Sequence, residues 1–239
     1  MNPQKPLRPD EANLAIATVV AAALGELRET LVFVGGCATG LLVTSVRAQA
    51  IRMTDDVDLV AHVTSQQEYH QLEKRFSALG FVHDLSAEAP ICRWICKGVT
   101  VDLMPTLPDI LGFHNRWYGM AVETAETLIL SEGLSIRLIT APLFLATKIE
   151  AFKGRGAGDF LTSHDLEDII TVVDGRNTLL DEITLCNDHL KTYLGAEFTT
   201  LMTNDRFLEA LPGHLPGDRG SQQRLGSLLT KLRQIASLE

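Results

Sequence analysis

Three aspartates carry the strongest chemical signal in this sequence. Asp56 and Asp58 alternate with Val57 and Leu59. Alternate side chains on a strand point to the same face, so the two carboxylates converge on one side while their apolar neighbours anchor the strand on the other. Rigidly held carboxylate oxygens suit Mg²⁺, which at protein sites commonly accompanies phosphates.

Asp102 is the best candidate for a third carboxylate. It is the one charged residue in the apolar run 99–104, where an unpaired charge is costly to bury. Three carboxylates on neighbouring strands predict a site for two Mg²⁺ ions, which clamp the attacking and leaving oxygens of an in-line displacement. Asp102 is also a candidate base for the proton of an attacking hydroxyl. The alternative is three acids at strand ends with no shared role, because short motifs match by chance.

The Gly35-Gly36 pair lies between an apolar run and a helix-forming segment, just upstream of the aspartates. Glycine lets the backbone approach a ligand closely, and the N-terminus of the following helix offers N–H groups. We therefore predict a phosphate cradle at Gly35 and Gly36. A tight turn without a ligand is the alternative.

The periodicity of the apolar residues predicts a mixed first half and a helical second half. Strands are expected at 31–34, 57–62, 81–83, 91–96, 100–104, 127–129 and 134–139, with a Lys97-Gly98 turn between the fourth and the fifth. Helices are expected at 9–30, 36–46, 65–79, 143–153 and 163–173, with at least three more in 179–237 and an irregular stretch at 112–120. Ser65 and Glu68 resemble a capping box at the start of the third helix. The predicted fold class is α+β. A small mixed β-sheet with flanking helices (domain 1–140) is followed by a C-terminal helical domain (141–239) that completes a ligand cleft.

Composition narrows the class of protein. The chain has 239 residues, of which 46% are hydrophobic, which is enough to bury a core. The net charge of −9 argues against a broad phosphate-binding surface, because nucleic-acid affinity depends on Lys and Arg. The four cysteines complete no zinc pattern and are interpreted as reduced thiols. The sequence shows neither a signal core nor a membrane-length apolar run, so we expect a cytoplasmic protein with no membrane partner.

A second group of charged residues lies in the helical half. Lys148 and Arg155 are seven residues apart and share one helical face, and Asp165 and Asp168 share a face of the next helix. Lys148 is a candidate for holding a triphosphate as a point charge. Asp165 is a candidate for fixing Lys148 or Arg155, or for contacting an acceptor, and Asp168 is given no role. The alternative is two solvated helices that exchange surface salt bridges.

A third group of residues is aromatic and basic. We interpret it chiefly as loop packing, although such residues also form base-stacking surfaces. Its members are Arg93, Trp94, His114, Arg116, Trp117 and Tyr118.

The order of the motifs resembles that of the DNA polymerase beta-like nucleotidyltransferase superfamily. The matching segments are Val34-Gly35-Gly36, residues 54–59, and Val101-Asp102-Leu103. The resemblance implies transfer of a nucleoside monophosphate from an NTP (ATP, CTP, GTP or UTP) to an acceptor, with two Mg²⁺ held by Asp56, Asp58 and Asp102. Arg52 and Thr54 stand where this family commonly has Arg-x-Thr, which implies support for the metal strand or the phosphates.

The helical half is similar to the AbiEii-type toxin nucleotidyltransferases. These carry a Lys-x-x-Ala…Arg segment and then an Asp-x-x-Asp helix, matched here by Lys148, Arg155 and Asp165 with its partner three residues on. One departure is His164, which replaces the usual basic residue before the first Asp. The resemblance implies that Lys148 and Arg155 bind the nucleotide, that Lys148 and Asp165 take part in catalysis, and that an antitoxin protein is a partner.

Two functions of different class follow from the sequence. The first is an Mg²⁺-dependent nucleotidyltransferase whose acceptor hydroxyl belongs to an RNA or tRNA end, a protein or a small molecule, with a role as the toxin of a toxin–antitoxin pair. The second is a non-catalytic nucleotide-binding or interaction protein of the same fold. The acidic balance favours a protein or small-molecule acceptor, whereas the resemblance to the toxins favours RNA.

Overall fold

The computed structural model describes residues 9–45, 51–156 and 158–238. Within these ranges the chain forms two compact units. The described residues of the first unit are 9–41 and 52–139, and those of the second are 42–45, 51, 140–156 and 158–238. The sequence-based division placed 42–51 in the first domain, and residues 46–50 of that segment lie outside the described residues. In the structure the backbone N–H groups of Thr44 and Ser45 both donate to the carbonyl oxygen of Gly175, at 3.0 and 2.8 Å, and so tie this segment to the second unit.

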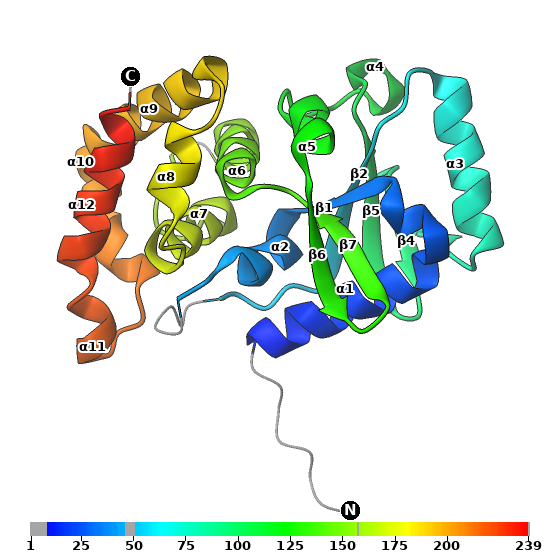
Figure 1. Cartoon of the computed structure of the whole chain (residues 1–239), viewed down its shortest axis with the longest axis horizontal. Coiled ribbons are helices and arrows are strands. Elements are labelled where there is room, and N and C mark those ends of the chain that lie inside the picture. The colour runs from blue at the N-terminus through cyan, green and yellow to red at the C-terminus, as the bar shows by residue number, and fades with distance from the viewer. Residues whose placement is uncertain (1–8, 46–50, 157, 239) are drawn as a thin grey trace, which may run out of the picture. The chain divides into compact units, whose positions relative to one another are not determined.

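The first unit is built on a seven-stranded mixed sheet (Figure 1). Its strands are β1 (Leu31–Val34), β2 (Asp56–Ala61), β3 (Val82–His83), β4 (Arg93–Cys96), β5 (Val99–Pro105), β6 (Glu126–Ser131) and β7 (Leu134–Leu138). Their order is β3-β4-β5-β2-β1-β7-β6. The pairs β2–β5 and β1–β7 are parallel, and the other neighbours are antiparallel. The strand β1, which lies between β2 and β7, is buried along its whole length, as its run of apolar residues predicts.

Among the described residues, five helices belong to the first unit. They are α1 (Pro9–Leu24), α2 (Gly35–Leu42), α3 (Gln66–Ala78), α4 (Pro108–Leu111) and α5 (Tyr118–Thr124). The helix predicted at 9–30 ends earlier because Gly25 adopts φ +56, and a 3₁₀ turn (Gly25–Glu29) follows. The stretch 112–120 was predicted to be irregular, but α5 begins within it.

The start of α3 follows the predicted capping pattern in part. The side chain of Ser65 accepts a hydrogen bond from the backbone N–H of Glu68 at 3.2 Å. The carboxylate of Glu68 turns back to the backbone N–H and hydroxyl of Thr64, at 2.6 and 2.8 Å. The reciprocal contact of a capping box therefore forms one residue earlier than the usual position.

An aromatic cluster fills the core between α3 and the β3–β4 side of the sheet. The ring centroids of Phe76 and Phe81 lie 4.7 Å apart, and those of Phe76 and Trp94 lie 5.5 Å apart. His83 stacks on the same indole at 3.6 Å. All three hydrophobic rings are almost fully buried, so this cluster anchors the strands that carry the candidate site.

The second unit consists of helices. They are α6 (Ala141–Arg155), α7 (His164–Gly175), α8 (Leu179–Thr184), α9 (Asp188–Met202), α10 (Asp205–Ala210), α11 (Arg219–Gln222) and α12 (Leu225–Ala236), with a 3₁₀ turn at Leu211–His214. The helix α6 packs on α7 and α9, and α12 packs on α7 and α9 (Figure 1). The apolar positions Leu228, Leu232 and Ile235 of α12 are buried against these neighbours.

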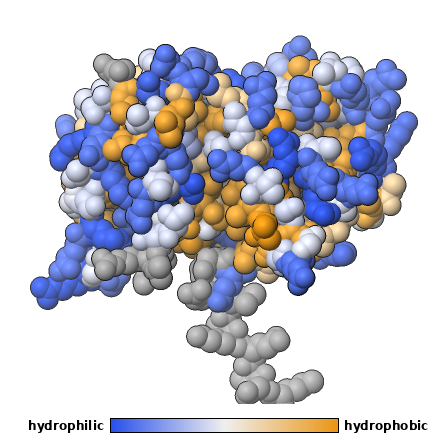
Figure 2. Space-filling view, in the orientation of Figure 1, coloured by the Kyte–Doolittle hydropathy of each residue, from blue (hydrophilic) through white to orange (hydrophobic). Residues whose placement is uncertain are grey.

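The predicted α+β class is confirmed, with a mixed sheet and flanking helices followed by a helical region. Hydrophilic side chains are spread over the visible faces of both units, interrupted by smaller hydrophobic areas (Figure 2). No helix in the described ranges is long and apolar enough to cross a membrane.

The aromatic cluster gives a direct test of the first unit. Phe76→Ala removes a fully buried ring and should lower the free energy of unfolding by about 3–5 kcal/mol. Ile129→Ala, at a side chain that is 74% exposed, should change it by less than about 0.5 kcal/mol. Urea unfolding followed by tryptophan fluorescence reports on this unit, because Trp94 and Trp117 both belong to it. Equal losses for the two variants would contradict the placement of Phe76.

Candidate functional site

The pairing of β2 with β5 brings the three predicted aspartates onto one face of the sheet. In this parallel pair Asp58 stands opposite Asp102, and Asp56 stands opposite Thr100. Directly opposed residues of neighbouring strands share a face, and so do alternate residues of one strand. The three carboxylates of Asp56, Asp58 and Asp102 therefore lie on the same face, with Val57 and Leu59 fully buried on the other.

Arg93 holds the carboxylate of Asp102 in a two-point ion pair. The guanidinium Nε donates to Oδ1 at 2.9 Å and Nη2 donates to Oδ2 at 2.8 Å. The two residues are register partners on β4 and β5. A bidentate pair of this kind fixes orientation as well as charge. The hydrogen bonds to Asp102 raise the pKa of Arg93 above its ordinary value, so the guanidinium stays charged.

Gly35 allows the backbone to approach Asp58. It adopts φ +67 at the junction of β1 and α2, and a Cβ atom placed there would lie 1.7 Å from Oδ2 of Asp58. No side chain fits that space, and the left-handed backbone also disfavours other residues. The turn and the carboxylate therefore form one packed unit.

A hydrogen-bonded bracket holds the residues that precede β2. Nδ2 of Asn13 donates to the carbonyl oxygen of Arg52 at 2.8 Å, and Oδ1 of Asn13 accepts from the backbone N–H of Thr54 at 3.0 Å. The hydroxyl of Thr54 donates to Oδ1 of Asp56. A Cβ on Gly36 would lie 2.9 Å from Nη2 of Arg52 and 3.3 Å from Oγ1 of Thr54. Arg52, Thr54 and Gly36 are thus packed together, and Thr54 orients the Asp56 carboxylate.

The donor chemistry of this face fits Mg²⁺, although the carboxylates are not gathered around one point. Among the described residues, no group of three or more His, Cys, Asp or Glu side chains is placed to hold a metal ion. Both oxygens of Asp102 accept hydrogen bonds from Arg93. Each carboxylate oxygen retains a further lone pair for a cation. The predicted metal role of Asp56, Asp58 and Asp102 therefore stays a prediction.

The second predicted charge group forms a network within the second unit. Nζ of Lys148 lies 3.2 Å from Oδ1 of Asp165 and 2.7 Å from Oδ2 of Asp168. Arg155 pairs with both oxygens of Asp165, at 2.9 Å each. The side chains of Lys148, Asp165 and Asp168 are 8%, 4% and 1% exposed, whereas that of Arg155 is 72% exposed. The expected contacts of Asp165 with Lys148 and Arg155 are present, and the surface salt-bridge alternative does not hold for the three buried members.

Burial and ion pairing act in opposite directions on Asp165. Burial disfavours the charged carboxylate, but the hydrogen bond from Arg155 and the charge of Lys148 outweigh it and lower the pKa of Asp165. A low pKa keeps this carboxylate ionised at neutral pH, which maintains the network.

Two residues of the site were missed or misjudged from the sequence. Arg93 was interpreted as loop packing, but the predicted two-residue Lys97-Gly98 turn already sets the hairpin register that pairs Arg93 with Asp102. Asn13 has no local signal, because it lies on α1, about forty positions before the residues that it brackets. Trp94 and Trp117 are buried, in line with the packing interpretation.

Comparison with known proteins gives distant structural similarities. Neither a protein-family model nor a curated protein matches the chain. An antigenic nucleotidyltransferase-like protein from Paracoccidioides brasiliensis is similar at 23% identity over 87% of this chain and 95% of that protein, with a TM-score of 0.49. The antibiotic-resistance factor ANT(2'')-Ia is similar at 18% identity over 68% and 83%, with a TM-score of 0.45. JHP933 from Helicobacter pylori is similar at 14% identity over 95% and 92%, with a TM-score of 0.48.

These identities and TM-scores are low, so the site is interpreted from this chain's own residues. The carboxylate face and the Gly35 turn belong to the first unit, whereas the network of Lys148 and Asp165 belongs to the second.

The contact between Gly35 and Asp58 yields a matched pair of variants. Gly35→Ala should destabilise the first unit by more than Gly133→Ala, because Gly133 has nearly the same φ of +72 but open space around its Cβ position. The Gly133 variant isolates the backbone strain, about 1–2 kcal/mol, and the excess at Gly35 measures the clash with Asp58. Urea unfolding by tryptophan fluorescence provides the comparison. An equal cost at both positions would show that the carboxylate does not occupy this space.

The ionised state of Asp165 should appear in the pH dependence of stability. Its pKa is lowered in the folded state, so its contribution is present above the unfolded value of about 3.9 and is lost as the pH falls through the folded pKa. The stability difference between the native chain and Asp165→Asn should therefore be full near neutral pH and narrow below about pH 4. Urea unfolding followed by far-UV circular dichroism measures it. If the difference in free energy of unfolding between the native chain and Asp165→Asn grew as the pH fell, the pKa of Asp165 would not be lowered in the folded state.

Proposed function

We propose that the protein is a nucleotidyltransferase that moves a nucleoside monophosphate from an NTP to an acceptor hydroxyl. The observation that carries the proposal is the register of β2 and β5. It places Asp58 opposite Asp102, with Gly35 packed so closely on Asp58 that only a glycine fits. An incidental acid pair at strand ends has no need of that close approach. A phosphate-handling site needs it, because backbone N–H groups and carboxylates must reach the same ligand.

The reaction places a separate demand on each residue of this face. The acceptor oxygen forms a bond to the α-phosphorus of the NTP, the bond to the bridging oxygen breaks, and pyrophosphate leaves. We assign the acceptor proton to the carboxylate of Asp102, as general base. Arg93 orients this carboxylate and keeps it from rotating. Asp56 and Asp58 supply the remaining negative charge of the face.

Mg²⁺ is the cofactor whose chemistry this donor set suits, and we propose two ions. Asp56, Asp58 and Asp102 would hold them, because Mg²⁺ prefers carboxylate oxygens together with substrate phosphates. When bound, the ions neutralise the phosphate charge. Thr54, held by Asn13, restrains Asp56, and Gly35 and Gly36 leave the backbone open to the phosphates.

We further propose that Arg155 is the exposed cation of the network that Lys148 forms with Asp165 and Asp168, and that Lys148 acts mainly through Arg155. Lys148 lies between two carboxylates, which offset its charge. Arg155 is held by Asp165 but is largely exposed, so its guanidinium can bind a phosphate bidentately. The catalytic roles of Lys148 and Asp165 implied by the family resemblance are retained as proposals on this basis.

The proposal leaves three classes of acceptor. RNA or tRNA ends, protein side chains and small hydroxylated molecules all present the required hydroxyl. A toxin role with an antitoxin partner rests on the resemblance in the helical half. Labelled ATP, CTP, GTP and UTP offered with each acceptor class would identify the substrate by the product that carries the label.

The activity is tested with aspartate variants. Asp58→Asn and Asp102→Asn keep the side-chain shape but remove the charge, and Asp102→Asn should lower transfer about 10²–10⁴-fold. Asp55→Asn is the matched control, because the exposed Asp55 directly precedes β2. Transfer of label from [α-³²P]NTP in the presence of Mg²⁺ is the measurement.

Two outcomes would overturn the proposal of a nucleotidyltransferase that uses this site. One is an absence of transfer to every acceptor class together with Mg²⁺–NTP binding that requires Asp58, which would favour a non-catalytic nucleotide-binding protein. The ion pair of Arg93 with Asp102 is the observation that favours this second candidate. The other is NTP binding and transfer that are insensitive to Asp58→Asn, which would place any activity elsewhere.

A further inference from the structure

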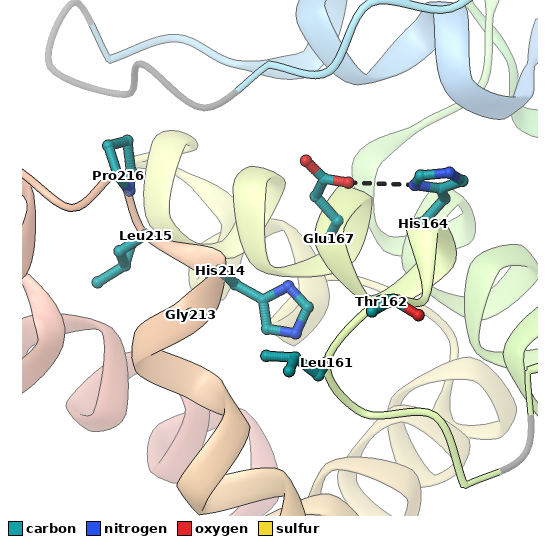
Figure 3. A pocket seen from close by; sticks show the side chains of 8 residues that line it. All are labelled: Leu161, Thr162, His164, Glu167, Gly213, His214, Leu215 and Pro216. Carbon is teal, nitrogen blue, oxygen red and sulfur yellow. Dashed lines mark hydrogen bonds and ion pairs between the residues drawn. The ribbon is translucent and has the colours of Figure 1, made fainter.

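A pocket of about 390 Å³ lies in the second unit, lined by segments 161–167 and 213–216 (Figure 3). The first segment is the loop and first turn of α7, and the second is the end of the 3₁₀ turn with the chain that follows it. A volume of this size falls within the range of about 300–1,000 Å³ seen for small-molecule sites. None of the residues discussed for the carboxylate face lines this pocket.

The buried imidazole of His214 presents an acceptor at this pocket. The residue is 7% exposed, and its Nε2 lies 2.7 Å from the carbonyl oxygen of Phe160. A carbonyl oxygen only accepts, so Nε2 must carry the hydrogen. In the neutral ring, Nδ1 is then a lone-pair acceptor. Figure 3 shows this second nitrogen on the ring edge away from Leu161.

The other polar groups of the pocket are also acceptors. Glu167 brings a carboxylate, and Nδ1 of His164 lies 3.3 Å from its Oε2, drawn as the dashed line in Figure 3. A carboxylate only accepts, so this His164 nitrogen donates and the opposite one accepts in the neutral ring. The hydroxyl of Thr162 gives its hydrogen to Asp159, which leaves its lone pairs. The pocket therefore calls for a ligand rich in hydrogen-bond donors.

An anion is disfavoured at this site even though α7 begins beside it. The N–H of Leu166 is accepted by the hydroxyl of Ser163 at 3.4 Å, and that of Glu167 by the carbonyl oxygen of Ser163 at 3.0 Å. Two of the backbone donors at this helix end are thus engaged within the protein. Glu167 itself adds negative charge where an anion would sit, so the charge selects a cation.

We propose that this pocket binds a small organic ammonium, a protonated amine on a short aliphatic skeleton. An ammonium group brings three donors and one positive charge, which match Glu167, His214 and Thr162. Leu161, Leu215 and Pro216 line the same pocket and provide apolar surface for the carbon chain. The inference is independent of the proposed transferase activity, because it uses no residue of the carboxylate face.

The test uses the full chain and 1,4-diaminobutane as the probe, at about pH 8, where imidazole is ordinarily neutral. Nitrogen-15 NMR of labelled histidine side chains reports the ring state and the binding. We expect saturable binding that shifts the Nδ1 signal of His214, assigned by comparison with a His214→Gln variant. Glu167→Gln should weaken binding at least about tenfold, the value of a charged hydrogen bond.

The controls separate charge from shape and from general surface attraction. Glu209→Gln alters an exposed glutamate of α10 and should change affinity by no more than about twofold. The neutral 1,4-butanediol should bind much more weakly than the diamine, and inorganic phosphate should not shift His214. Three results would overturn the proposal: no saturable binding of the diamine, equal binding of the diol, or equal weakening by the Glu209 and Glu167 variants.

Discussion

The architecture of the first unit depends on one electrostatic constraint, the parallel alignment of β2 and β5 that sets Asp58 directly opposite Asp102. Neighbouring strands lie about 4.8 Å apart, and like charges directly opposite each other destabilise a sheet. Arg93 offsets this repulsion from the next strand, since its guanidinium binds both oxygens of Asp102. The charge of Asp102 also reaches Cys92, because burial and then this carboxylate raise the pKa of that thiol to about 12. The strands β2, β5 and β4 thus each supply one member of this charge arrangement: Asp58, Asp102 and Arg93.

The backbone around the site follows from the same constraint. Because Val34 is the register partner of Asp58, the turn after β1 must pass beside that carboxylate, and Gly35 makes this passage possible. Asp56 is controlled from the other direction, by Thr54 and the Asn13 bracket. The two carboxylates of β2 therefore contact different parts of the chain: Asp56 accepts from Thr54, and Asp58 packs against Gly35. This arrangement suits a site in which Asp56 and Asp58 have different roles.

The sequence predicted those parts of the molecule that are governed by local pattern. The seven strands followed from apolar runs and turn residues, and the start of α3 followed from Ser65 and Glu68. The helix α5 did not, because it is only seven residues long and begins with Tyr118 and Gly119, which are weak helix formers, and because it packs on β1 and β2. Asn13 and the link between residues 44–45 and Gly175 depend on contacts far apart in the chain. Arg93 is an intermediate case. Its partner Asp102 lies on the next strand, and the register of the β4–β5 hairpin pairs the two residues.

The buried charges of Lys148, Asp165 and Asp168 lose their hydration on folding, and this unfavourable free energy suggests that the network serves function. A buried ion pair contributes little net stability, because the loss of hydration offsets the Coulomb attraction, and apolar residues of similar volume often serve the fold equally well. Lys148, Asp165 and Asp168 are nonetheless buried together, with only Arg155 extending to the surface. Packing alone therefore does not explain this arrangement. It does have a specific consequence: Asp165 accepts from Arg155 through both oxygens, and this hydrogen bonding, together with the charge of Lys148, lowers the pKa of Asp165 and keeps it ionised. A flexible surface side chain is thereby fixed in direction, as a residue that must meet a phosphate in a defined orientation requires.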